Sequence, residues 1–156
     1  MPGGLWRHVV VMVLAVVVAA GCGVLSLGQG RTFGTAFPDD GDGAGLIVSV
    51  QDGTGRVVGL DVAEQMPDGQ PLEASVVLMR HPVEPEAFIV GWLGGDCDIE
   101  TTFSISPAEF GRVTVSMRTE VEANACQDLG IERVAIITMD GPVDLSRIAL
   151  EVIGDG

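Results

Sequence analysis

The feature of this sequence that most limits its fold is an alternation of apolar and polar residues with a period of two. In the clearest run, the odd-numbered residues from Ile99 to Ile105 face one way and the even-numbered residues from Glu100 to Ser106 face the other. A period of two is typical of a half-buried β-strand. Residues 112–119 repeat the pattern, and the connection at residues 107–111 predicts a hairpin between the two strands.

Short strands of this kind recur along most of the chain. They are expected at residues 46–50, 56–62, 74–80, 88–93, 98–106, 112–119, 133–139 and 147–153, the first two joined across residues 51–55. No segment keeps a helical repeat over three turns, although residues 120–129 could form one helical turn. The chain is therefore predicted to be all-β, an immunoglobulin-like antiparallel β-sandwich of about 7–8 strands with one disulfide; a barrel is the alternative. Because Trp92 precedes both Cys97 and Cys126, the Cys-Trp-Cys order of immunoglobulin domains is absent, and only a generic sandwich is supported.

The first 22 residues have the form of an export signal. Arg7 precedes an apolar run at residues 9–20, and small residues lead up to Cys22. This segment resembles the lipobox of bacterial lipoproteins, which implies cleavage after residue 21 and a diacylglycerol on the Cys22 thiol. The resemblance also implies an extracytoplasmic protein anchored in the cell membrane by its lipid. Two alternatives stay open: residues 9–27 as an uncleaved anchor, and an ordinary secretory signal with a free mature form.

The composition divides the rest of the chain into a linker and a folded domain. After the signal peptide at residues 1–21, residues 22–45 are rich in glycine and aspartate and are predicted to be a flexible tether. The β-sandwich domain is then expected at residues 46–156. The formal net charge is −14, and the sequence contains no lysine. Nucleic-acid binding needs a concentrated cationic surface, so nucleic acid is not expected as a partner.

Two cysteines are left once Cys22 is assigned to the lipid. Cys97 and Cys126 form an even pair in an oxidising compartment, which favours one structural disulfide. The bond would close a loop of about 30 residues and stabilise the fold by roughly 3–4 kcal/mol in the chain-entropy model. Their separation lacks the Cys-x-x-Cys spacing of a redox pair.

Few residue types in the mature chain could carry chemistry or hold a ligand. Asp96, Asp98 and Glu100 are expected on one strand face, either as a weak cation site or hydrolase pair, or as the solvated outer face of a strand. Trp92 lies among glycines and is a candidate ligand contact, although the shortage of other large side chains favours a core position. His81 precedes Pro82 and is interpreted as a loop residue. The sequence shows no metal-binding or cofactor motif, so neither is expected.

Three segments, residues 92–97, 125–131 and 140–144, resemble small uncharacterised actinobacterial lipoproteins. The resemblance implies a secreted β domain with one disulfide and supplies no catalytic residues. These observations together predict a lipid-anchored cell-envelope protein that is not an enzyme and that binds or scaffolds an envelope protein or glycan. The alternatives are an extracytoplasmic hydrolase that uses the acidic residues, and a lipoprotein that presents Trp92 to a small molecule or glycan.

Overall fold

The computed structural model describes residues 31–37, 46–53, 57–107, 112–122 and 130–154, and the regular structure in these residues is β apart from one short 3-10 turn. The strands are β1 (Arg31–Ala36), β2 (Ile47–Asp52), β3 (Val57–Ala63), β4 (Val76–Arg80), β5 (Ala87–Gly94), β6 (Asp98–Pro107), β7 (Val113–Val121), β8 (Ile131–Met139) and β9 (Ile148–Ile153). The 3-10 turn η2 (Leu145–Arg147) leads directly into β9.

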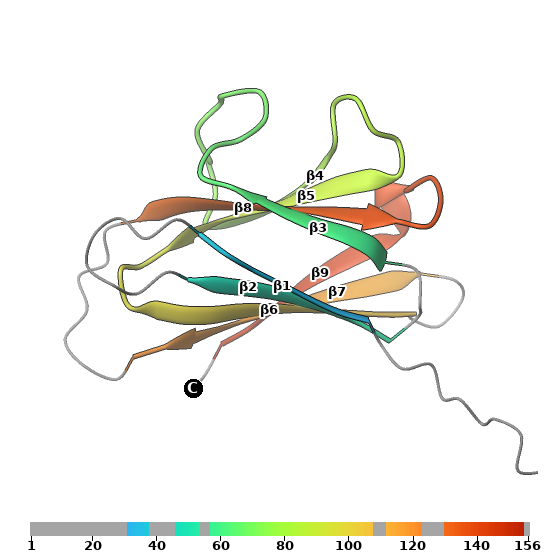
Figure 1. Cartoon of the computed structure of the whole chain (residues 1–156). Coiled ribbons are helices and arrows are strands. Elements are labelled where there is room, and N and C mark those ends of the chain that lie inside the picture. Colours follow the sequence, from blue (N-terminus) through green and yellow to red (C-terminus); the bar gives the residue numbers. More distant parts are fainter. Residues whose placement is uncertain (1–30, 38–45, 54–56, 108–111, 123–129, 155–156) are drawn as a thin grey trace, which may run out of the picture.

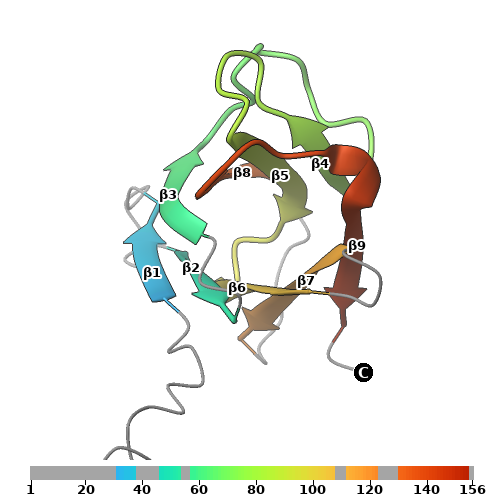
Figure 2. The ribbon, with the colours of Figure 1, turned by 90° about the vertical axis from the view of Figure 1, so that its right-hand side faces the viewer.

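The strands form two sheets that lie face to face as a sandwich (Figure 1). The five-stranded sheet has the order β1-β2-β6-β7-β9, and the four-stranded sheet has the order β3-β8-β5-β4. In the view along the strands, β1 and β3 lie side by side and nearly close one side of the sandwich (Figure 2). On the other side the edge strands are β4 and β9, and η2 lies against β4.

Two strand pairs are parallel, which corrects the expected antiparallel sandwich. β2 runs parallel to β6, with Val50 beside Phe103, and β7 runs parallel to β9, with Val115 beside Leu150. The cause is that each parallel pair is separated by strands of the other sheet: the chain passes through β3, β4 and β5 between β2 and β6, and through β8 between β7 and β9. β2 and β3 therefore do not pair, although consecutive strands of an antiparallel sheet commonly do.

Aromatic side chains occupy the centre of the core between the two sheets. The Trp92 ring meets the rings of Phe37 and Phe103 edge to face, at centroid distances of 6.3 and 5.5 Å. The quadrupole of each ring favours this arrangement over face-to-face stacking. Buried aliphatic residues from both sheets surround the rings, among them Val48, Val50, Val90, Val115 and Ile137.

The eight expected strands are confirmed, but the predicted tether is wrong at its C-terminal end. Residues 31–36 form a ninth strand, β1, which pairs antiparallel with β2, and Phe37 is buried in the core. The folded domain therefore includes residue 31 rather than starting at residue 46. The hairpin of β6 and β7 is confirmed. Of the expected helical turn, residues 120 and 121 belong to β7, and residues 123–129 lie outside the described residues.

Candidate functional site

Trp92, the candidate ligand contact, is 1% exposed and does not reach the surface. Its indole Nε1 is a buried donor with no hydrogen-bond partner. Arg133 lies directly opposite on β8, its Nε is also a buried donor without a partner, and its guanidinium carbon is 4.7 Å from the centre of the Phe37 ring. A cation in this position is attracted by the ring quadrupole. Trp92 thus occupies the core position that the sequence favoured, where its ring has no face open to a glycan.

The three carboxylates Asp96, Asp98 and Glu100 do not share one strand face, which corrects the sequence prediction. Asp96 lies in the turn before β6 and is exposed, whereas Asp98 is only 8% exposed and accepts the Gly95 backbone N–H at 3.0 Å. Pairing with β7 passes from Asp98↔Val121 to Glu100↔Glu120, so Ile99 is an extra residue on β6. This bulge turns Asp98 and Glu100 to opposite faces of the sheet and leaves Ile99 45% exposed.

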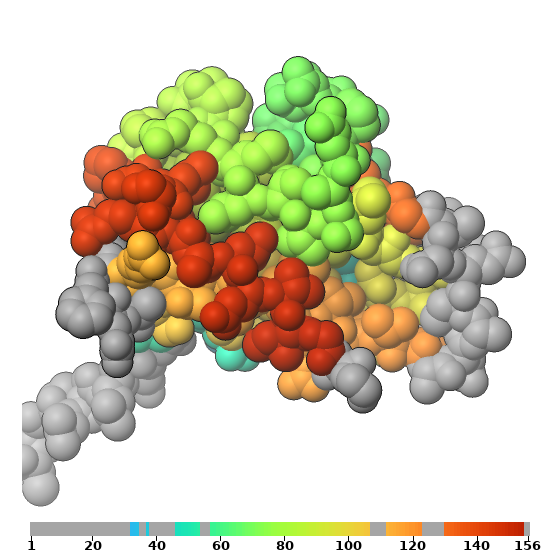
Figure 3. Space-filling view, turned by 180° about the vertical axis from the view of Figure 1, so that it is seen from behind, coloured from blue at the N-terminus to red at the C-terminus, as the bar shows by residue number. Residues whose placement is uncertain are grey.

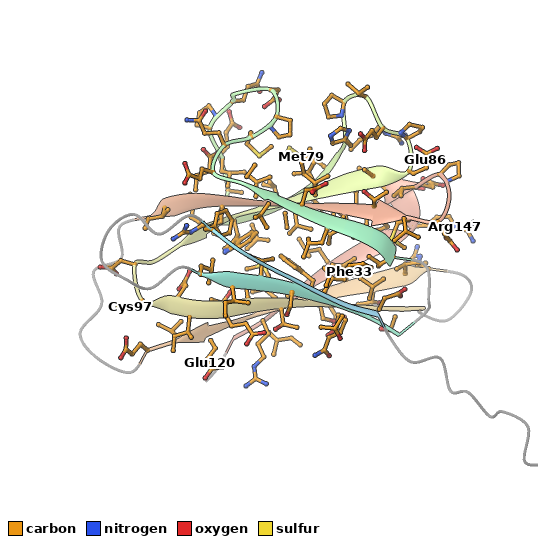
Figure 4. All side chains as sticks on the ribbon, in the orientation of Figure 1. Phe33, Met79, Glu86, Cys97, Glu120 and Arg147 are labelled. Carbon is orange, nitrogen blue, oxygen red and sulfur yellow. The ribbon has the colours of Figure 1, made fainter. Side chains whose placement is uncertain are left out.

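Glu100 belongs to a polar cluster on the outer face of the five-stranded sheet. The hydroxyls of Ser49 and Thr102 both donate to Glu100 Oε1, at 3.1 and 3.3 Å. Glu120 lies directly opposite Glu100 on β7, on the outer side of the molecule (Figure 4). A shallow hollow of about 300 Å³ on this face is lined by Glu100, Thr102, Arg118 and Glu120. The cluster is polar and open, and it contains one of the three carboxylates that the sequence grouped together.

His81 and Cys97 each accept a hydrogen bond from a backbone N–H nearby in the fold. His81 Nδ1 accepts the Glu84 backbone N–H at 2.9 Å and so orders the loop between β4 and β5. Cys97 lies at one end of the sandwich (Figure 4), where its carbonyl accepts the Glu122 backbone N–H at 2.9 Å. Cys97 is disulfide-bonded. Cys22, the expected lipid site, and Cys126, the expected disulfide partner, both lie outside the described residues.

The outer face of the four-stranded sheet is covered by residues 64–75, the strap, which connect β3 to β4. The strap begins with a turn in which the Gly69 N–H donates to the Met66 carbonyl at 2.8 Å, and Gly69 has a positive φ of 69°. Met66 is buried against Ile89 and Val134 of the sheet. The strap therefore closes a second, smaller apolar cluster on the side of the sheet that faces away from the main core.

Two contacts hold the middle of the strap to the sheet at Leu72. Its backbone N–H donates to Glu132 Oε1 of β8 at 3.0 Å. Its side chain lies over Gly91 of β5 so closely that a Cβ at residue 91 would be 2.7 Å from Leu72 Cδ2. The absence of a side chain at Gly91 is therefore what lets the strap approach the sheet. One backbone contact and one side-chain contact from the same residue fix the strap in place.

The strap groove is the hollow between the strap and β4. Its volume is about 440 Å³, and its lining residues are Met66, Asp68, Gln70, Pro71, Leu72, Glu73, Val77 and Met79. Met79 points away from the main core on this outer side of the sheet (Figure 4). The strap and the 81–86 loop form two separate prominences beyond the sheet (Figure 3). The groove combines an apolar floor with two exposed acids, Asp68 and Glu73, at its rim.

Comparison with known proteins identifies no relative for this chain: no family model, curated protein or solved structure matches it. In the part of the chain that the structure describes, no three His, Cys, Asp or Glu side chains are grouped so that they could hold a metal ion. The same part contains no helix with the length and apolar character needed to cross a bilayer.

Sequence reasoning missed the strap groove, although the sequence contains two signals for it. Residues 87–93 are an almost continuous apolar run rather than an alternating one, which is typical of a strand that is covered on both faces. The connection of 12 residues from 64 to 75 is also long for a sandwich loop, and it carries apolar Met66 and Leu72. Together these features indicate a loop that folds back over a strand.

Proposed function

We propose that this chain is a lipid-anchored, extracytoplasmic binding protein without catalytic activity, and that the strap groove is its recognition site. The observation that carries the proposal is the groove itself, a hollow of about 440 Å³ with an apolar floor and an acidic rim. One wall of the groove is the strap, which Leu72 fixes to the sheet. Ligand sites in proteins are commonly concave and mostly apolar, with a few polar groups that set orientation. The partner is an exposed aliphatic side chain, flanked by Lys or Arg, on another envelope protein.

The groove chemistry favours a protein partner over a glycan. Sugars are commonly bound by stacking on aromatic rings, and the groove lining has no aromatic side chain. Met66 and Met79 are unbranched and adaptable, which suits a floor that takes a side chain of variable shape. Asp68 and Glu73 at the rim attract a positive charge and repel an acidic one, in keeping with the net charge of −14.

The lipid anchor in this proposal rests on the resemblance of residues 1–22 to a lipobox. Between Cys22 and β1 there are eight residues, 23–30, which reach at most about 30 Å when extended. An anchored domain would therefore stay close to the membrane surface, where other envelope proteins are available as partners. The finer fold assignment, an immunoglobulin-like sandwich stapled by Cys97 and Cys126, belongs to the same proposal and is supported by the disulfide at Cys97.

We prefer binding to hydrolysis because the residues that motivated a hydrolase are dispersed. Asp98 is directed inward and Glu100 outward, and Asp96 lies in a turn. A glycosidase pair needs two carboxyl groups about 5–10 Å apart that face one substrate. Trp92, which motivated a ligand site of another kind, lies in the core.

Methionine-methyl NMR tests the strap groove directly. The probe is a short capped peptide, Gly-Lys-Leu-Lys-Gly, with the glutamate analogue Gly-Glu-Leu-Glu-Gly as its control. We expect the first peptide to shift the methyl signals of Met66 and Met79, which line the groove, and to leave Met117 and Met139 in the main core unchanged. Equal shifts at all four methyl signals, or no shifts at all, would refute binding in the strap groove. Shifts caused by a soluble peptidoglycan fragment and not by the peptide would refute the proposed protein partner.

Charge reversal at the rim supplies a matched control. Glu73→Lys should weaken binding of the lysine peptide at least fivefold, because an attractive charge becomes repulsive. Glu120→Lys makes the same change in net charge on the outer face of the other sheet and should leave binding unchanged. A similar loss in both variants would show that net charge, and not the groove, attracts the peptide.

Detergent partition tests the anchor. The mature protein is expected to enter the detergent phase of Triton X-114 and to carry a diacylglycerol mass at residue 22. Cys22→Ala should remain an unprocessed precursor, whereas Gly23→Ala should be processed as usual. A Cys22→Ala variant with the same size and phase behaviour as the wild type would overturn the lipid assignment.

A further inference from the structure

Among the described strands, β9 is an edge strand whose one device against pairing is a single charged residue, Glu151. On the opposite side of the sandwich, β1 and β3 lie next to each other, and β3 also carries a bulge between Val57 and Gly59. β9 has six residues, Ile-Ala-Leu-Glu-Val-Ile, with no proline, no basic residue and no bulge in its pairing with β7. Natural edge strands are usually blocked by such devices. An edge with so little protection is a template for one more strand.

The apolar residues of β9 are also unusually open to solvent. Val152 is 57% exposed and Ile153 is 49% exposed, although both lie in a regular strand. The strand lies on the surface in the view from behind, where the C-terminal segment crosses the molecule (Figure 3). Ile148 and Leu150, on the same face of the strand as Val152, pack against the main core. Val152 continues this apolar row beyond the part that the chain itself covers.

We propose that β9 pairs with β9 of a second copy of this chain, antiparallel and about a two-fold axis, so that the two five-stranded sheets become one continuous sheet. The sequence of β9 selects the register. Centring the pair on Leu150 places Leu150 opposite its own counterpart and Ile148 opposite Val152, so the core-side row is aliphatic throughout. Ala149 then lies opposite Glu151 on the outer face.

Neighbouring registers are less favourable for a physical reason. Centring the pair on Glu151 would place two glutamates directly opposite each other, and like charges in that position destabilise a sheet. An odd shift would bring core-side residues opposite outer-face residues, because side chains alternate with a period of two. Centring the pair on Ala149 would place Ile148 opposite Leu150, but it would place Val152 opposite Ser146, which lies outside β9 and leaves Val152 uncovered. The Leu150-centred register avoids these costs and places Val152 of each copy opposite Ile148 of the other. This pairing is independent of the strap groove and of the lipid anchor.

Light scattering on the full chain, in detergent with micelles in large excess, tests the pairing. We expect a dimer that dissociates on dilution. Val152→Lys places a charge on the core-side row of the edge and should weaken association at least tenfold. Val83→Lys is the matched control, because Val83 is 81% exposed in the loop between β4 and β5, and this variant should associate like the wild type. A monomeric wild type at every concentration up to 1 mM, or equal loss in both variants, would overturn the proposal.

Cysteine crosslinking tests the register of the β9 pair, which the mass measured by light scattering does not report. A double variant carries both Ala149→Cys and Glu151→Cys, at two exposed positions of β9. It should form a covalent dimer under mild oxidation, because residue 149 of one copy is opposite residue 151 of the other. Val83→Cys should give little dimer under the same conditions. Raised salt should favour the dimer, since it screens the repulsion between two chains of net charge −14. A crosslink yield equal to that of Val83→Cys would reject the Leu150-centred register.

Discussion

The close approach of Leu72 to Gly91 makes a quantitative prediction about the strap. A Cβ at residue 91 would lie 2.7 Å from Leu72 Cδ2 and 3.2 Å from Val77 Cγ2. Carbon atoms pack at about 3.5–4.0 Å, so Gly91→Ala displaces the Leu72 methyl by about 1 Å. Overpacking of this kind costs about 1–3 kcal/mol, and the alanine regains about 0.5–1 kcal/mol by restricting the unfolded chain. Because Leu72 Cδ2 is the end of a half-buried side chain that can move aside, the net fall in the free energy of unfolding is expected to be about 1 kcal/mol.

Urea unfolding followed by far-ultraviolet circular dichroism measures this change, with two comparisons. Gly34→Ala is the control, because a Cβ there would have no neighbour within 4 Å; its stability should stay the same or rise slightly. In a Leu72→Ala background the displaced methyl is gone, so Gly91→Ala should cost less than about 0.5 kcal/mol. An undiminished cost in that background would refute the reasoning, since the loss would then come from β5 itself and not from the strap.

Three further predictions concern residues outside the strap. The Ser146 hydroxyl donates to the Asp144 carboxylate at 2.7 Å and the Ser146 backbone N–H donates to it at 3.1 Å, and both hydrogen bonds lower the pKa of Asp144. The stabilisation that the ionised Asp144 gives to the fold is therefore complete above the usual Asp pKa of about 3.9. This stabilisation is lost as the pH falls through the lowered pKa of the folded state. Ser146→Ala should raise the NMR titration midpoint of this carboxyl, and an unchanged midpoint would contradict the assignment. Ellman's reagent should detect no free thiol on the mature chain before reduction; two titrating thiols would exclude a bond between Cys97 and Cys126. Trp92→Ala should lower the free energy of unfolding by about 3–5 kcal/mol, as for other buried aromatic residues, and a loss below about 1 kcal/mol in urea unfolding is incompatible with its core position.

The strands were predictable because their apolar pattern is local, whereas their pairing was not. β6 and β7 alternate cleanly, and their hairpin follows from the short connection between them. β1 escaped prediction because Phe33 is its one large apolar residue, and because Phe33 and the following Phe37 lie in a segment whose glycine content is typical of a linker. The parallel pairing of β2 with β6 depends on where the chain crosses between sheets, and no short stretch of sequence specifies that.

The candidate sites failed or were missed for different reasons. The carboxylates of Asp98 and Glu100 were placed together by strict alternation, and the extra residue Ile99 breaks that alternation without any glycine or proline to mark it. The strap groove depends on a contact between residues far apart in sequence, Leu72 with Gly91 and Glu132. A glycine within an apolar strand indicates a close approach of some other segment, but it does not indicate which one.

The mixed five-stranded sheet affects the order in which the chain can fold as it emerges from its N-terminus. β1 and β2 emerge first as a hairpin, yet Ser49 of β2 pairs with Thr102 of β6, 53 residues later. Contacts of such long sequence separation slow folding, because the intervening loop must close before they form. The edge of β2 that pairs with β6 therefore has no partner until about two-thirds of the chain is available.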